Sequence, residues 1–72
     1  MKTPHDLKVE FLTYVTRLRE DAQSELDLFG SGTVVMRRNG EDITAELVER
    51  LKATIARLDD LISKLERDLS AL

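Results

Sequence analysis

Apolar positions in the first part of the chain recur with the spacing of a helix. A row from Leu7 to Phe29 advances mostly in steps of three or four residues, which places its members on one helical face. The row consists of Leu7, Phe11, Tyr14, Val15, Leu18, Ala22, Leu26 and Phe29. Charged side chains occupy the other side. We therefore predict a helix over 4–29 that buries this row, with Phe11 and Tyr14 in the core.

The residues on either side of this helix carry the usual signals for its two ends. Thr3 can accept from the backbone at the N-terminus, Pro4 suits the first helical position, and Asp6 can complete a capping box. Gly30 follows the last apolar position and can adopt the left-handed conformation that ends many helices. We expect the helix to stop at this glycine.

The connector over 30–43 has a different character. A β-branched, apolar stretch over 33–36 precedes Asn39-Gly40, a dipeptide that strongly favours a two-residue hairpin turn. The pattern predicts a strand over 33–38 and a shorter return strand over 41–43. An ordered loop without a β-ladder is the alternative, because an isolated hairpin is marginally stable in water.

The last part of the chain has the most regular pattern. Thr44 is predicted to cap a helix over 44–72, with Ile43 and Val48 in contact across the cap as a hydrophobic staple. Apolar residues then fill the a and d positions of consecutive heptads, and two leucines at g positions widen the stripe. The predicted oligomer core comprises Leu47, Val48, Leu51, Ile55, Leu58, Leu61, Ile62, Leu65 and Leu69.

These elements predict a mainly all-α protein in one domain over 1–72. Two helices of matched length with a short connector favour an antiparallel helical hairpin. The wide stripe of the second helix suits contact with two neighbours, so we expect two hairpins to pair into a four-helix bundle. A parallel coiled-coil dimer through the second helix is the alternative, since β-branched residues at a and leucine at d favour it.

Composition strengthens the expectation of an oligomer. A chain of 72 residues builds only a marginal core, and with no cysteine it cannot use disulfides or thiolate metal sites. Its net charge of −3 provides no basic field for nucleic acid, so we do not expect such a partner. It has neither an apolar run of the length that crosses a bilayer nor a secretory h-region. We expect a cytoplasmic protein without membrane contact.

The residues that usually carry chemistry are sparse. His5 is the single imidazole and has no second ligand at helical spacing, so we interpret it as an exposed first-turn residue. The carboxylates near the end of the first helix are interpreted as a solvated face. We therefore predict no catalytic residue, no metal site and no cofactor, and we expect that the protein is not an enzyme.

Two groups of residues are candidates for contact with a partner. Arg37, Arg38 and Asn39 form a basic pair and turn on the connector, where they can contact an acidic group or, alternatively, protect a strand edge from aggregation. Val9 and Leu12 lie beside the main apolar row of the first helix. Apolar residues in such a position suit a subunit or partner interface.

The order helix, small hairpin and helix, with its turn at Asn39-Gly40, is similar in layout to the head–tail joining protein W family of tailed phages. The likeness covers the connector over 33–43 and both flanking helices. This chain has a longer second helix and a shorter return strand, and it lacks the basic tail of that family. The resemblance implies a structural connector in a virion and transfers no functional residue.

The hypothesis that these patterns favour is a non-enzymatic protein–protein interaction module. It would self-associate through its amphipathic helices and would have a protein partner, as a small phage or mobile-element adaptor or an inhibitor of a host protein. One alternative is a small nucleic-acid or nucleotide binder that uses Arg37 and Arg38. The other is the virion connector.

Overall fold

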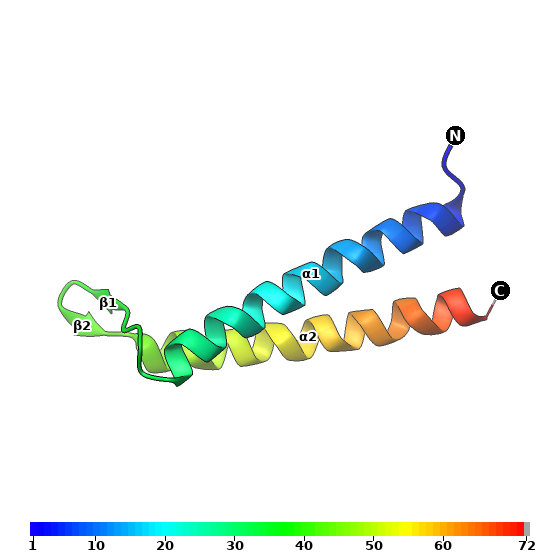
Figure 1. Cartoon of the computed structure of the whole chain (residues 1–72). Coiled ribbons are helices and arrows are strands. Elements are labelled where there is room, and N and C mark those ends of the chain that lie inside the picture. The colour runs from blue at the N-terminus through cyan, green and yellow to red at the C-terminus, as the bar shows by residue number, and fades with distance from the viewer. Residues whose placement is uncertain (72) are drawn as a thin grey trace.

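The computed structural model describes residues 1–71 and shows two long helices joined by a small antiparallel β-hairpin (Figure 1). The elements are α1 (Pro4–Gly30), β1 (Arg37–Arg38), β2 (Glu41–Asp42) and α2 (Thr44–Ser70). The predicted antiparallel helical hairpin with a small β-hairpin in its connector is therefore confirmed. Leu72, the last residue of the predicted second helix, lies outside the described residues.

The N-terminus of α1 has the predicted capping box. The Thr3 hydroxyl accepts from the Asp6 backbone N–H at 3.1 Å, and the Asp6 carboxylate accepts from the Thr3 N–H at 3.2 Å. Pro4 follows as the first helical residue, where its missing N–H costs nothing. These local signals fix where α1 begins.

The C-terminus of α1 differs from the prediction. Gly30 is the last helical residue, and the left-handed residue is Gly32, with φ of 78°. Ser31 accounts for the extra helical residue, because its N–H donates to the Asp27 carbonyl and its hydroxyl donates to the Leu28 carbonyl. The helix thus continues one residue beyond the expected stop.

The β-hairpin pairs Arg37 with Asp42 and Arg38 with Glu41. Its turn residues Asn39 and Gly40 have φ of 52° and 84°, the two positive values that a type I′ turn requires. The predicted strand over 33–38 is too long, because α2 begins at Thr44 and leaves 33–35 no return strand to pair with.

The start of α2 also differs from the prediction. Thr44 is the first helical residue and does not cap the helix. Its hydroxyl instead accepts from the Met36 backbone N–H at 2.9 Å, while the Asp42 carboxylate accepts from the Thr44 N–H at 2.9 Å. The Ile43 N–H donates to the Met36 carbonyl at 2.9 Å. These bonds attach the hairpin directly to the first turn of α2.

The two helices form a single layer. They lie against each other near the connector and diverge toward the two termini (Figure 1). The molecule measures 51 × 22 × 18 Å, and its radius of gyration of 16.1 Å exceeds the value of about 11 Å expected for a compact domain of this length. Among the described residues, the buried hydrophobic side chains are those of Val15, Ala22, Ile55 and Leu65.

Candidate interaction surfaces

α1 carries two apolar rows, not the single row that the sequence predicted. The row against α2 follows heptad steps and is buried or half-buried; its apolar members are Leu12, Val15, Ala22, Leu26 and Phe29. A second row remains exposed and consists of Leu7, Phe11, Tyr14 and Leu18. The prediction that Phe11 and Tyr14 belong to the core is therefore wrong. Their side chains are 45% and 59% exposed.

The two rows differ in direction by about a quarter of a turn. At about 100° per residue, Leu7, Phe11, Tyr14 and Leu18 fall within a narrow arc, roughly 80° from the centre of the row that faces α2. The sequence pattern combines both rows into one stripe. A prediction from that pattern therefore places the buried face between the two rows. We name the exposed group the α1 outer row.

Arg19 occupies a central position of the row that faces α2. Its guanidinium Nε donates to the Asp59 carboxylate at 2.7 Å, and both side chains are partly exposed. The hydrogen bond and the charge of Asp59 raise the pKa of Arg19 above its ordinary value. Sequence reasoning missed this contact. The heptad steps from Leu12 through Val15, Arg19 and Ala22 are the signal that could have found it.

The apolar positions of α2 face α1 within the same chain. Ile55 and Leu65 are buried, and the other seven members of the predicted oligomer core are half-buried. Because α2 has one concentrated stripe, its phase was predicted correctly. The role of these residues in a larger assembly stays a prediction. The half-buried state of most of them leaves apolar area that a further helix can cover.

The predicted partner residues do not form one surface. Arg37, Arg38 and Asn39 are exposed on the β-hairpin, whereas Val9 belongs to the N-terminal part of α1. The N-terminal end of α1 and the β-hairpin lie at opposite ends of the molecule (Figure 1). Leu12 is half-buried in the row facing α2, so the expectation that it lies apart from the core row is wrong.

The tip of the molecule combines apolar and basic side chains. Val34, Val35 and Met36 are exposed directly before the two arginines of β1. The pKa of the Asp42 carboxyl is lowered, first by its hydrogen bonds from Thr44 and then, more weakly, by the charge of Arg37. We refer to 34–39 as the connector tip.

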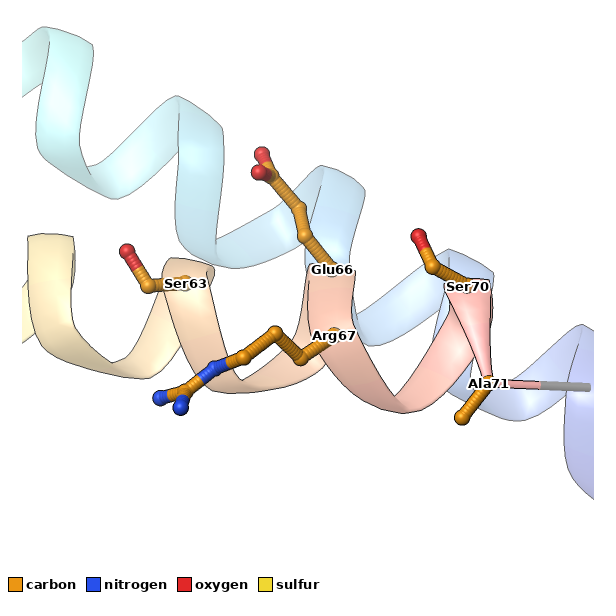
Figure 2. Close-up of a pocket in the computed structure, with 5 residues that line it drawn as sticks. All are labelled: Ser63, Glu66, Arg67, Ser70 and Ala71. Atoms are coloured by element: carbon orange, nitrogen blue, oxygen red, sulfur yellow. The ribbon is translucent and has the colours of Figure 1, made fainter.

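Four hollows on the described surface are open to solvent, and none of these four is lined by residues of both helices. The one shown in Figure 2 lies on the outer side of α2 near its C-terminal end. Glu66 and Arg67 point away from each other there, and no side chain of α1 lines the depression. An open surface of this kind does not bury a small molecule as ligand pockets do.

Residues 1–71 contain no group of three histidine, cysteine, aspartate or glutamate side chains placed to hold a metal ion. His5 is exposed in the first turn of α1. Within the same residues, no helix is both long and apolar enough to cross a bilayer. Comparison of the chain with protein-family models, curated proteins and solved structures gives no match.

Proposed function

We propose that this chain is a non-enzymatic interaction protein that self-associates through its helices and presents the connector tip to a protein partner. The observation that carries the proposal is the imbalance between buried and exposed apolar side chains. In the described residues four hydrophobic side chains are buried, whereas ten large ones are exposed. Contiguous exposed apolar surface is typical of protein interfaces.

The shape of the molecule supports the same proposal. The chain exposes 5612 Å² of surface, about 1,100 Å² more than the roughly 4,500 Å² expected for a compact monomer of its mass. A standard protein–protein interface buries about 800 Å² on each partner. The surplus surface is therefore larger than the area that a standard interface covers on one partner.

The dependence of stability on protein concentration tests this proposal. If folding is coupled to association, the midpoint of urea unfolding rises with chain concentration, because association stabilises only the folded state. Circular dichroism at a series of concentrations measures it. A midpoint that does not change with concentration, with a fully helical chain at the lowest one, would contradict the proposal.

The connector tip is the part of the proposal that concerns a different protein. Its three exposed apolar residues and two arginines provide an apolar contact and two charge-assisted donors on one small surface. The nucleic-acid and virion-connector hypotheses have no structural observation in their favour and stay predictions. The same holds for the expected cytoplasmic location.

A further inference from the structure

The α1 outer row is an apolar surface that residues 1–71 leave exposed. Its four members are spaced 4, 3 and 4 residues apart, the spacing of a coiled-coil seam. The row lies about a quarter turn away from the face that packs on α2. In a four-helix bundle each helix meets two neighbours at such an angle, and the hairpin supplies only one of them.

We propose that the α1 outer row is a homodimer interface, in which α1 packs antiparallel against α1 of a second copy. This inference rests on the proposed self-association and specifies its surface and direction. In the two-fold register that it implies, Leu7 faces Leu18 of the second copy and Phe11 faces Tyr14 of the second copy. The row is therefore complementary to itself under reversal, as a two-fold interface requires.

The charges beside the row identify the occupant as a second copy. Glu10 and Arg17 flank the row on the side away from α2, seven residues apart and opposite in sign. The antiparallel register places Glu10 of each copy next to Arg17 of the other, which gives two symmetric ion pairs. A parallel register would instead place these charges opposite Val15 and Ala22, where they gain nothing.

Within residues 1–71, the ion pairing of Glu10 and Arg17 leaves both side chains available for a second copy. Arg17 makes no ion pair within residues 1–71. Among the described residues Glu10 forms one ion pair, with Lys2 of the segment before α1, and both side chains of that pair are more than half exposed. Glu10 can therefore exchange this contact for Arg17 of a second copy at little cost.

The end of the row points to the same register. After Leu18 the next two positions of the same face are Asp21 and Glu25, so the apolar row stops there. In the antiparallel register Asp21 lies beside Pro4 of the second copy, at the N-terminus of its α1. A negative charge is favourable at that end of a helix because of the helix dipole.

Charge-reversal variants test the register without altering the apolar row. We expect Glu10→Lys and Arg17→Glu each to raise the dimer dissociation constant about tenfold, since two ion pairs become repulsive. The variant that carries both changes should return to within about twofold of the unmodified chain. Sedimentation equilibrium measures all four proteins, with circular dichroism to confirm that each one is helical.

A matched pair of apolar substitutions tests the surface itself. Phe11→Glu should abolish the dimer, whereas Leu28→Glu should leave its dissociation constant unchanged, because Leu28 is exposed on α1 ten residues beyond Leu18, outside the proposed register. If both variants dimerise like the unmodified chain, the outer row is not the interface, and the chain associates through another face. If the unmodified chain does not dimerise, the proposed self-association fails as well.

Disulfide trapping tests the direction of the helices. The chain has no cysteine, so chains with Glu10→Cys and chains with Arg17→Cys can be mixed and oxidised. The antiparallel register predicts that the mixed disulfide forms faster than either symmetric one. Predominance of the symmetric products would overturn the antiparallel arrangement.

Discussion

Arg19 of α1 and Asp59 of α2 are joined across the helix interface by a hydrogen bond of 2.7 Å. Arg19 stands in the row that faces α2, between the buried Val15 and Ala22. A polar residue in an otherwise apolar seam costs stability but specifies the alignment of two helices. We interpret this pair as the contact that fixes how far α1 is shifted along α2.

A double-mutant cycle on Arg19 and Asp59 measures how strongly this pair couples the two helices. Arg19→Ala and Asp59→Ala should each lower the unfolding temperature by a few degrees, and the double variant should lose less than the sum of the two. High salt should weaken the coupling, because both side chains are partly exposed. Strictly additive losses at low salt would show that the pair does not couple the helices.

Val15 is the most buried large side chain of the described residues, at 2% exposure. Val15→Ala should therefore lower the free energy of unfolding of the hairpin by about 2 kcal/mol, through lost burial and a cavity. Leu18→Ala removes more carbon atoms, yet Leu18 is 38% exposed and should matter less for folding than for association. Urea titrations at a concentration where the chain is monomeric compare the two. A larger loss for Leu18→Ala would contradict the assignment of the two rows.

The glycines of the connector should respond to alanine with opposite signs. Gly40 has φ of 84°, so Gly40→Ala should cost about 1 kcal/mol by straining the turn. Gly30 is helical with open space around it, so Gly30→Ala should gain up to about 0.5 kcal/mol from helix propensity. Thermal or urea unfolding of both variants provides the test. Destabilisation by both changes would indicate that Gly30 is needed for the end of α1.

Asp42 should make the start of α2 sensitive to acid. Its carboxylate accepts from the Thr44 N–H, and the lowered pKa means that folding favours the charged form. The stabilisation from this group is therefore complete above the ordinary pKa of 3.8 and is lost as pH falls through the lowered folded value.

The variant Asp42→Asn isolates this effect, because its amide oxygen retains an acceptor but cannot titrate. The difference in unfolding free energy between the unmodified chain and Asp42→Asn should be present at neutral pH. It should vanish in acid, below the lowered pKa. Other carboxylates titrate in both proteins and cancel. A difference that persists unchanged in acid would assign the role of Asp42 to shape and not to charge.

The sequence predicted α2 better than α1 for a physical reason. The apolar residues of α2 form one stripe that packs on one neighbour, so the pattern and the buried face coincide. In α1 two apolar rows overlap in sequence, with Val15 in one and Tyr14 in the other. Periodicity measures the combined row and cannot separate a face buried by α2 from a face that suits a second copy.

In the connector, too, the sequence predicted the local feature but not the contact between distant residues. Asn39-Gly40 predicted the turn because its backbone requirement is local, and positive φ suits few other residues. The role of Thr44 could not be predicted, because its hydroxyl contacts Met36, eight residues earlier, in a hairpin whose length was not known. Sequence reasoning thus placed Arg37 and Arg38 on an exposed hairpin, where the structure has them in β1, but did not find the α1 outer row.

We expect a second copy of the chain to cover the apolar surface that one hairpin leaves exposed. Sedimentation equilibrium of the unmodified chain over a range of micromolar concentrations tests it most directly. We expect a mass that rises toward at least twice the chain mass of 8.2 kDa as concentration increases. A stably folded chain whose mass stays at 8.2 kDa throughout that range would contradict it.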